Sequence, residues 1–473
     1  MHTVVLIPDG VGVRNFVLGP FLRQLKQQGR VTILHGLPAD VAERPELQHV
    51  PDVEWRPLPV YEEDPLTYQL RRALLFSHLY WGNTFGMQCM LRQSKPSGSL
   101  KTRIARHAAM LAGRMAATET GIRILDRQHE ARALNSSAAR EATEMLNELR
   151  PDVIFCSHQR PHIIAPFVAA ARAAGVPTAT FIFSWDNIPL KGRMASRFDH
   201  FLVWSELMRS ELHQFYPDVP RDRVHVVGTP QFDPYANGEL LWSREEYCRR
   251  VGADPARPII CYSGNDADGS PDDPAYVEIL AELLEQKAIN GNPQLLVRPA
   301  PVDNGRRFLP VLARHPSILL SEPKWYHPEG ENWSWVVPSP EDIQLLVNTV
   351  YHCAVNVNLA STMTLDFAIF DKPVVNLAID VVPPREGRTV REHNYRFDHY
   401  VPVVELGAAR LAHTRSELRD HLNRYLADPS LDRAERRKLV ELEVSLPIGS
   451  ASGRAIEALR QIAGGARSER GSH

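Results

Sequence analysis

The chain has 473 residues, which is too long for one ordinary domain and suggests two or three. Its 54 Lys and Arg nearly balance its 56 Asp and Glu, so the overall charge argues against nucleic-acid binding. Five widely spaced cysteines without a C-x-x-C pair fit a reducing cytosol and indicate no metal site. The N-terminus lacks a signal-peptide pattern and no apolar run reaches membrane-spanning length, so we expect a cytoplasmic protein.

The N-terminal half predicts a series of βα units. Residues 4–8 predict a strand, residues 9–12 a turn with two glycines, and residues 16–29 a helix. Further strands are predicted at 31–34, 153–156, 178–183, 201–204 and 224–227. Each is a short continuous apolar run, which is typical of a parallel sheet covered on both faces. The turn-rich segment 228–234 then predicts a link between domains.

The second half repeats this pattern. Strands are predicted at 258–263, 294–298, 318–320, 353–357 and 374–378, with helices at 276–287 and 343–350 between them. Strands that alternate with helices predict two Rossmann-like, doubly wound domains, 1–232 and 233–465, that face a cleft. Terminal helices at 411–427 and 452–462 are assigned to the second domain, although they can also cross back to the first. The polar tail 466–473 is expected to be disordered.

Residues 66–132 differ in character from the rest of the first domain. They contain eleven Lys or Arg against three acidic residues, together with many aromatic and aliphatic side chains. This helical, basic insertion predicts a peripheral contact with an anionic membrane at the inner face of the plasma membrane, or with a lipid-phosphate acceptor. The alternative is a group of solvated helices packed on the first sheet.

The segment 358–366 carries the strongest signal for a ligand site. It reads Asn-Leu-Ala-Ser-Thr-Met-Thr-Leu-Asp and predicts a strand end, a tight turn and the first turn of a helix. Ser361 and Thr362 would place hydroxyl groups and backbone N–H groups where a phosphate can bind. Asp366 would accept hydrogen bonds from a ribose diol. The alternative is an ordinary crossover with Ser361 or Thr362 as the helix cap.

Three segments together resemble the GT-B glycosyltransferases. The two-domain pattern and the link at 228–233 fit that architecture, and Ser361-Thr362-x-x-x-Asp366-Phe367 is similar to a segment of the CDP-glycerol glycerophosphotransferase group. Residues 184–187, Ser-Trp-Asp-Asn, followed by Lys191-Gly192, resemble a segment of bacterial surface-polysaccharide transferases. The resemblance implies that the second domain binds a nucleotide-activated donor.

One departure from the glycerophosphotransferase pattern concerns residues 298–301. That group commonly has Arg-x-His-Pro, whereas this chain has Arg-Pro-Ala-Pro, and Ala300 cannot titrate. The departure favours a sugar donor over a polyol-phosphate donor. Arg298 can pair with a diphosphate, or alternatively form an ion pair between domains. Ser263 and Gly264 could contribute backbone donors to the same leaving group.

Sugar transfer also needs neutralisation of the leaving diphosphate and, for inversion, a base. Asp9, directly after the first strand, is the first candidate, followed by His158 and then Asp186. No Asp-x-Asp clearly follows a strand, since Asp266-x-Asp268 lies in a polar loop, so we expect no metal site. Aromatic residues that could stack on a nucleobase, or simply pack, are Trp325, Tyr326, Trp333 and Trp335.

The resulting hypothesis is a glycosyltransferase without a metal ion or other cofactor. Its partners would be a nucleotide-sugar donor and a surface-glycan or lipid-linked acceptor, with no nucleic acid. Alternatives on the same fold are a polyol-phosphate transferase, a non-hydrolysing sugar epimerase and a catalytically silent binding or scaffold module.

Overall fold

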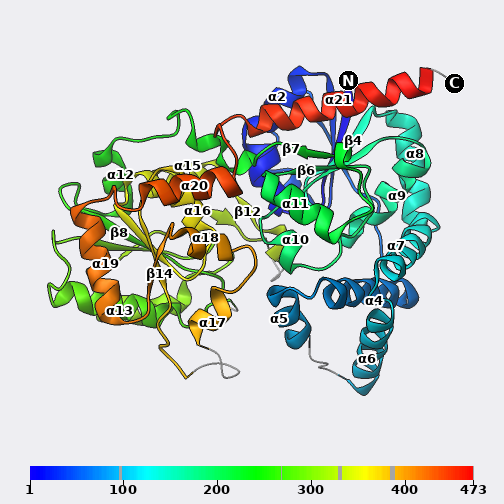
Figure 1. Cartoon of the computed structure of the whole chain (residues 1–473). Coiled ribbons are helices and arrows are strands. Elements are labelled where there is room, and N and C mark those ends of the chain that lie inside the picture. The colour runs from blue at the N-terminus through cyan, green and yellow to red at the C-terminus, as the bar shows by residue number, and fades with distance from the viewer. Residues whose placement is uncertain (95–98, 268, 329–332, 384–388, 472–473) are drawn as a thin grey trace. The chain divides into compact units, whose positions relative to one another are not determined.

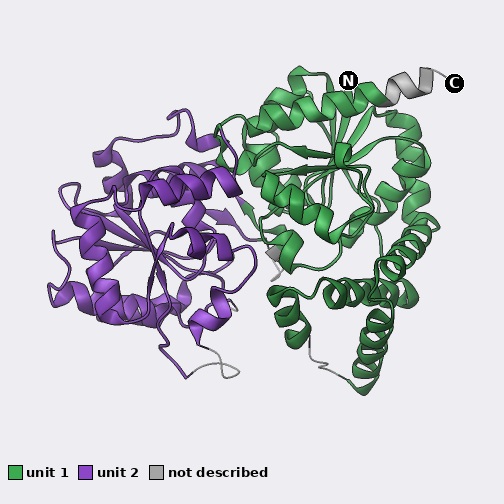
Figure 2. Ribbon diagram, in the orientation of Figure 1, with its two compact units in different colours: residues 1–233, 328–337, 447–473 green, residues 234–327, 338–446 purple. Residues whose placement is uncertain are grey.

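The computed structural model describes residues 1–94, 99–267, 269–328, 333–383 and 389–471, with side chains to residue 465. The chain forms two compact units (Figures 1 and 2). Unit 1 comprises Met1–Asp233, Pro328–Val337 and Pro447–His473, and unit 2 comprises Pro234–His327 and Pro338–Leu446. The first boundary lies in the expected link. Residues 328–337 and 447–465, however, belong to unit 1 instead of the second domain.

Unit 1 contains a seven-stranded parallel sheet in the order β3-β2-β1-β4-β5-β6-β7. Its strands are β1 (His2–Ile7), β2 (Arg30–His35), β3 (Glu54–Pro57), β4 (Val153–Cys156), β5 (Thr178–Phe181), β6 (His200–Val203) and β7 (Val224–Val226). The chain order reverses between β1 and β4, which makes this the topological switch point. Ligands of doubly wound sheets bind beside such a point, at the carboxyl ends of the strands.

Unit 2 contains a six-stranded parallel sheet in the order β10-β9-β8-β13-β14-β15. Its strands are β8 (Ile259–Ser263), β9 (Gln294–Arg298), β10 (Leu319–Leu320), β13 (Val355–Asn358), β14 (Val374–Leu377) and β15 (Arg410–Ala412). The switch point here lies between β8 and β13. The short strands β11 (Trp325–Tyr326) and β12 (Val337–Pro338) lie outside this sheet.

Helices cover these sheets (Figure 1). Those of unit 1 are α1 (Val11–Val13), α2 (Pro20–Gln27), α3 (Ala39–Ala42), α4 (Pro65–Gly82), α5 (Phe85–Gln93), α6 (Leu100–Met115), α7 (Glu119–Leu134), α8 (Ser137–Leu149), α9 (Ala165–Ala173), α10 (Asn187–Leu190), α11 (Glu206–Phe215) and α21 (Ala451–Gly471). Those of unit 2 are α12 (Arg244–Val251), α13 (Asp273–Glu285), α14 (Leu309–Arg314), α15 (Pro340–His352), α16 (Met363–Ile369), α17 (Val390–Asn394), α18 (Val401–Leu406), α19 (Arg415–Ala427) and α20 (Arg433–Glu443).

The core of unit 1 is built on aromatic side chains from α2, β4, β5 and the π-helix Arg14–Leu18. The ring centroid of Phe16 lies 5.0–5.1 Å from the ring centroids of Phe21, Phe155 and Phe181, in the edge-on contacts that aromatic rings favour. All five cysteines are buried and reduced, namely Cys89, Cys156, Cys248, Cys261 and Cys353. Within the described residues, no helix is long and apolar enough to cross a membrane.

The structure differs from the predicted elements at three places. The helix expected at 16–29 is divided into the π-helix Arg14–Leu18 and α2, because Gly19 is extended and Pro20 starts a new helix. The helix expected from 411 begins only at Arg415, after β15. The tail expected to be disordered from 466 continues α21 through Gly471, while 472–473 lie outside the described residues.

Candidate active site and donor-binding edge

Asp9 and His158, the two leading candidates for the base, contact each other directly. Asp9 follows β1 and His158 follows β4, and these strands pair in parallel with Leu6 opposite Cys156. The carboxyl ends of the two strands therefore bring both side chains to the switch point, where Asp9 Oδ2 lies 2.7 Å from His158 Nδ1. Both residues are buried, at 3% and 5% exposure.

This contact decides the role of each ring nitrogen of His158 when the imidazole is neutral. A carboxylate only accepts, so His158 Nδ1 carries the proton and Nε2 keeps a lone pair. The other Asp9 oxygen accepts from the backbone N–H of Val11 at 3.2 Å, which fixes the carboxylate. The ring of His158 also packs against Phe183, with 5.3 Å between centroids. The Asp9 carboxylate therefore fixes the orientation of the His158 ring and leaves Nε2 as the nitrogen that can accept a proton.

Asp186, the third candidate, lies in a separate set of contacts after β5. Its carboxylate pairs with Lys191 Nζ at 3.3 Å and accepts from the side-chain amide of Asn187 at 3.0 Å. The same Asn187 accepts from Gln159 Nε2 at 2.9 Å. Gln159 directly follows His158, so this chain of bonds connects the Asp186 segment to the loop of the pair.

Arg160, which the sequence analysis did not single out, adds a positive charge to this loop. Desolvation lowers the pKa of its guanidinium, while attraction to Asp186, Tyr216 and Asp9 opposes that shift. Its charge therefore acts on both candidate carboxylates. A single arginine after a strand end carries no distinctive sequence signal.

Gly10 allows another segment of unit 1 to approach the Asp9 turn closely. Its N–H donates to the carbonyl of Ser334 at 2.6 Å, and an added Cβ would stand 2.1 Å from the carbonyl oxygen of Val336. Only glycine leaves room for this backbone. The turn that carries Asp9 is thus held from outside its own βα unit.

In unit 2, the turn after β8 is held by its own hydrogen bonds. The N–H of Gly264 donates to the carbonyl of Arg298 at 2.9 Å, and that of Asn265 donates to Asp273 at 2.8 Å. The Ser263 hydroxyl accepts from Asn356 Nδ2 at 2.8 Å. The N–H groups of Gly264 and Asn265 are therefore engaged within the protein, and the expected donation from this turn to a leaving group stays a prediction.

Arg298 lies at the end of β9 and is 4% exposed. Its Nη2 lies 3.0 Å from both carboxylate oxygens of Asp342, in the first turn of α15, so the ion pair forms within unit 2. Asp342 also accepts from the backbone N–H of Lys324 and from Trp325 Nε1, at 2.8 and 2.6 Å. Among the described residues, Arg298 Nη1 is buried without a hydrogen-bond partner. This N–H donor thus has no acceptor in the described part of the protein.

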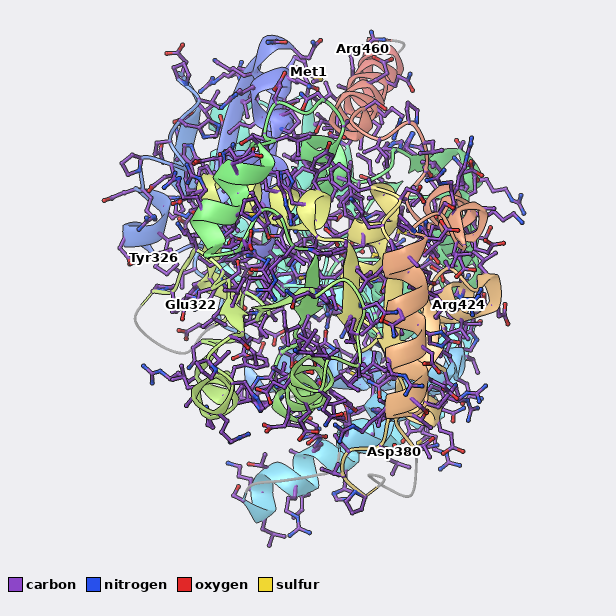
Figure 3. The ribbon with its side chains drawn as sticks, turned by 90° about the vertical axis from the view of Figure 1, so that its left-hand side faces the viewer. Met1, Glu322, Tyr326, Asp380, Arg424 and Arg460 are labelled. Atoms are coloured by element: carbon purple, nitrogen blue, oxygen red, sulfur yellow. The ribbon has the colours of Figure 1, made fainter. Side chains whose placement is uncertain are left out.

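Ser321 adds a second unused polar group beside Arg298. It follows β10, which pairs with β9 through Leu320 and Val297, so the two side chains follow neighbouring strand ends. Its hydroxyl, like Arg298 Nη1, is buried and unpartnered in the described part of the chain. In the segment that follows, labelled at Glu322 and Tyr326 in Figure 3, the indole N–H of Trp325 donates to Asp342. The expected stacking of these aromatic residues on a nucleobase stays a prediction.

Buried amides fix the turn that contains Ser361. Asn358 Oδ1 accepts from the Ser361 N–H at 3.0 Å and from Asn376 Nδ2 at 2.9 Å, while Asn358 Nδ2 donates to Asn356 at 2.6 Å. Ala360 adopts a left-handed φ of 45°, which costs about 1 kcal/mol or more for a non-glycine residue. Such a network holds a strained turn at the second switch point, next to Ser263.

The polar groups expected to bind the donor are partly engaged. The Ser361 hydroxyl accepts from the N–H of Met363 at 3.4 Å, and Thr362 is the N-cap of α16 without a side-chain capping bond. Asp366, in the first turn of α16, is 3% exposed and accepts from the hydroxyl of Tyr235. The ribose role of Asp366 stays a prediction, and Tyr235 is a partner that no sequence pattern indicates.

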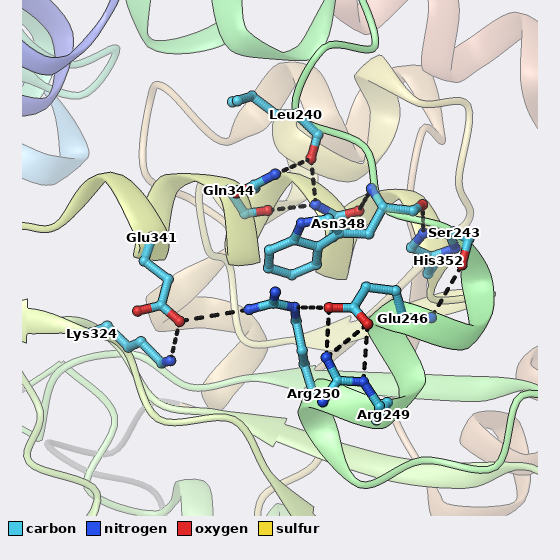
Figure 4. Close-up of polar contacts among 11 residues, drawn as sticks. Leu240, Ser243, Glu246, Arg249, Arg250, Lys324, Glu341, Gln344, Asn348 and His352 are labelled. Atoms are coloured by element: carbon cyan, nitrogen blue, oxygen red, sulfur yellow. Dashed lines mark hydrogen bonds and ion pairs between the residues drawn. The ribbon is translucent and has the colours of Figure 1, made fainter.

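A polar network anchors α15, which carries Asp342, to α12 and the segment before it (Figure 4). Asn348 accepts from the N–H of Trp242 at 2.7 Å and donates to the carbonyl of Leu240 at 2.8 Å. Arg250 stacks on the Trp242 ring at 4.2 Å and lies 3.8 Å from Glu341, which also pairs with Lys324. A cavity of about 280 Å³ lies beside Trp242, Arg250, Lys324 and Glu341 and also reaches Ser321.

The described residues contain no group of three or more His, Cys, Asp or Glu that could hold a metal ion. Asp266 is exposed, and Asp268 lies outside the described residues, as does the side chain of Trp333.

A family model matches part of the chain. Residues 105–230, from α6 to just after β7, match the model of Glycosyltransferase Family 4. The matched segment includes His158 and Asp186. This match confirms the expected enzyme class, a glycosyltransferase. No curated protein matches the chain in sequence.

Solved structures of similar fold include sugar-nucleotide enzymes. A putative UDP-N-acetylglucosamine 2-epimerase from Listeria monocytogenes has TM-score 0.54 and 10% identity, covering 97% of this chain and 96% of its own. The UDP-GlcNAc 2-epimerase from Neisseria meningitidis, bound to UDP-GlcNAc, has TM-score 0.53 and 11% identity, with 98% and 100% covered. A glycosyltransferase from Rickettsia africae has TM-score 0.51 and 11% identity, with 98% of both chains covered. These likenesses confirm the GT-B fold with two Rossmann-like domains.

Proposed function

We propose that this glycosyltransferase transfers a sugar from a nucleotide-diphosphate or nucleotide-monophosphate donor to a surface-glycan or lipid-linked acceptor in the cytoplasm, without a metal ion. The observation that carries the proposal is the Asp9–His158 pair, with 2.7 Å between its polar atoms at the first switch point. A buried imidazole that is held in one orientation is suited to remove a proton from a sugar hydroxyl. UDP-GlcNAc, the ligand of the Neisseria epimerase, is a first donor to test.

In an inverting transfer, His158 Nε2 takes the proton of the acceptor hydroxyl. The hydroxyl oxygen bonds to the anomeric carbon, and the bond from that carbon to the donor phosphate oxygen breaks. The nucleotide leaves with the electron pair of that bond. Asp9 keeps the ring oriented through Nδ1 and stabilises the imidazolium that forms. Asp186 would act as an acceptor-side contact, since Lys191 and Asn187 already hold its carboxylate.

For the donor, we assign the leaving phosphate to Arg298 and to the turn at Ser361 and Thr362. Support comes from the buried, unpartnered Nη1 of Arg298, because an unused N–H of a guanidinium donates strongly to a phosphate oxygen. Asp366, which accepts from the hydroxyl of Tyr235, is assigned to the ribose. Ser263 and Gly264 shape the neighbouring turn.

We also propose that α6 contacts an anionic membrane. Four large apolar side chains, spaced to lie along one face of α6, are 60–79% exposed: Leu100, Ile104, Leu111 and Met115. Basic residues flank this face, including Lys101, Arg103 and Arg114. An apolar stripe between cations is the pattern of a helix that lies in a membrane interface. Elsewhere in the insertion the excess charge is reduced, since Arg71 and Arg132 pair with Glu63 and Asp64.

The first experiment is a thermal-shift panel of UDP, GDP, CDP, CMP, dTDP, ADP and NAD. A ligand that binds only the folded state raises the melting temperature. We expect one nucleoside phosphate to give a selective shift, and the corresponding nucleotide sugar then to support glycan extension. Extension with a nucleotide-activated polyol phosphate instead would indicate a polyol-phosphate transferase. Donor turnover without an acceptor would indicate an epimerase, and binding without any turnover a scaffold.

A further inference from the structure

Unit 1 contains a large cavity away from the Asp9–His158 pair. Its volume is about 640 Å³, within the range that holds small organic ligands. Residues before or at the start of β5 and β6, such as Pro177 and His200, line it together with part of α21 near Ile462. These residues lie at the amino-terminal edge of the sheet, whereas Asp9 and His158 follow carboxyl-terminal strand ends. We call this space the basal cavity.

Two histidines and an arginine on the wall of the basal cavity form a chain of hydrogen bonds. Arg223 Nη1 lies 2.8 Å from His200 Nε2, and His200 Nδ1 lies 3.1 Å from His225 Nε2. A guanidinium only donates, so His200 Nε2 accepts and Nδ1 carries the proton. His200 then donates to His225 Nε2, and the proton of His225 is on Nδ1. The chain runs from a permanent positive charge to an N–H of His225 on β7.

Both imidazoles are neutral near pH 7, as these tautomers require. Burial, Arg223 and His225 lower the pKa of His200 to about 4. Burial, Arg209 and Arg223 also lower the pKa of His225. Each bond in the chain polarises the next, which strengthens the final N–H as a donor.

Two carboxylates of the cavity wall are already paired with arginines. Asp126 accepts from Arg193 Nε at 2.8 Å. Asp199 accepts from Arg172 Nε at 3.1 Å and from the backbone N–H of Thr178 at 3.0 Å. These acceptors are therefore occupied by protein donors, and they compete weakly with a ligand for the remaining cations.

Two arginines keep N–H groups outside such pairs. Within the described residues, Arg197 has a hydrogen bond only from Nη1, to Glu130 at 3.0 Å. Arg223 has a loose ion pair with Asp222 at 3.9 Å, and that carboxylate is 80% exposed and therefore well solvated. A further rim carboxylate, Asp218, is also present. Arg197 and Arg223 thus each keep N–H groups that these contacts do not use.

We propose that the basal cavity binds a small organic anion through a phosphate or carboxylate group, with Arg223, Arg197 and His225 as its donors. Guanidinium N–H groups match the oxygen atoms of either anion, and the apolar atoms of Phe198 and Ile462 contact its carbon skeleton. The basal cavity belongs to unit 1, whereas the residues proposed to bind the sugar donor belong to unit 2.

Isothermal titration of the full chain with inorganic phosphate, glycerol 3-phosphate and citrate tests the site. The three probes also show whether the site prefers a phosphate or a carboxylate group. We expect at least one probe to bind, and Arg223→Gln to raise its Kd about tenfold or more. Arg221→Gln is the matched control, because Arg221 is exposed on the same short helix, Arg221–Arg223, and does not line the cavity. Its Kd should stay within about twofold of the wild-type value.

A second measurement does not depend on a variant. Long-range ¹H–¹⁵N spectra of the imidazoles should show His225 protonated on Nδ1 and its signals moving during the titration, while those of the exposed His107 stay fixed. The proposal is overturned if no probe binds below about 10 mM, if His225 signals do not respond, or if both arginine variants bind alike. If Arg298→Gln abolishes binding and Arg223→Gln does not, the anion binds at the donor residues of unit 2. That result would reject the proposal for the basal cavity and leave the proposed donor site standing.

Discussion

His158 and Asp9 should differ in their effect on turnover because they have different roles. With the donor identified, His158→Gln should lower kcat by about 10²-fold or more at nearly unchanged donor affinity, since the proton acceptor is lost. Asp9→Asn keeps the size of the side chain but removes the charge that stabilises the imidazolium, so a smaller loss is expected. Steady-state kinetics with direct donor-binding measurements check both values.

The exposed His107 on α6 provides the control for His158, and His107→Gln should leave kcat unchanged. A mild effect of His158→Gln beside a severe one of Asp9→Asn would reverse the roles and make Asp9 the base.

Glu443, at the end of α20, should make the stability of the protein fall as pH rises. Burial raises its pKa from 4.5 to about 8, and its Oε1 has no hydrogen-bond partner among the described residues. Between these values the unfolded chain releases the proton and the folded chain keeps it, so the contribution of Glu443 to stability is greatest below pH 4.5 and is lost as pH rises towards 8.

Glu443→Gln should remove this decline and stabilise the protein at pH 7 by on the order of 3 kcal/mol. Denaturant unfolding from pH 5 to pH 8 measures the effect, with the more exposed Glu441→Gln as the control. Parallel pH curves for wild type and Glu443→Gln would contradict the prediction.

At the scale of the element, the turn between β1 and α1 depends on Gly10. Gly10→Ala would place a Cβ 2.1 Å from the Val336 carbonyl oxygen, so either backbone must move. We expect a loss of about 2 kcal/mol in stability and a lower kcat, because Asp9 moves with the turn. Gly464→Ala in α21 is the matched control, because its Cβ would meet nothing within 4 Å and should be neutral or slightly stabilising. Equal effects of the two variants would show that the close approach of the Val336 carbonyl to Gly10 does not matter for stability or turnover.

The exposed face of α6 should bind vesicles that contain anionic lipid. Binding should weaken steeply as salt rises from low to physiological concentration, because lysine and arginine supply part of the attraction. The double variant Ile104→Asp and Leu111→Asp should abolish binding in a flotation assay. Leu309→Asp, at a similarly exposed apolar residue of α14, should not. If vesicle binding changes neither with salt nor in the α6 double variant, the helices of the insertion are solvated and have no membrane role.

At the scale of the whole molecule, the last segment of the chain completes the fold of unit 1. Asp233 accepts from the backbone N–H groups of Ala451 and Ser452 at 3.0 and 2.8 Å, and Leu459 is fully buried. A chain that ends at residue 446 should therefore lose the cooperative unfolding of unit 1 in calorimetry, whereas a chain that ends at 465 should keep it. A normal transition without α21 would show that its packing contributes little.

The sequence predicts the inner strands of both sheets because they are continuous apolar runs. It does not reveal β3, where Glu54, Arg56 and Pro57 interrupt the pattern, or β15, which has only three residues. Short or charged edge strands gain their conformation from pairing with a neighbour, and one sequence carries no record of that pairing.

The candidate residues could be found one by one, but not their contacts. Asp9 and His158 both follow predicted strands, yet 149 positions separate them and only the order of the sheet brings them together. Asp342 as the partner of Arg298 depends in the same way on how α15 packs. A local signal existed, since Ser339-x-x-Asp342 is a helix start. This signal predicts where α15 begins, but it does not predict the ion pair between Asp342 and Arg298.

The rate at which the buried cysteines react with a thiol reagent reports how often the structure around each of them opens. Cys89 and Cys156 belong to unit 1, and Cys248, Cys261 and Cys353 belong to unit 2. A thiol reagent can modify each of them only when its surroundings open. Mass spectrometry of the labelled peptides would therefore measure the opening rate of each unit separately in the wild-type chain. A ligand of one sheet would slow the labelling of that unit first, which reveals where it binds before any residue is replaced.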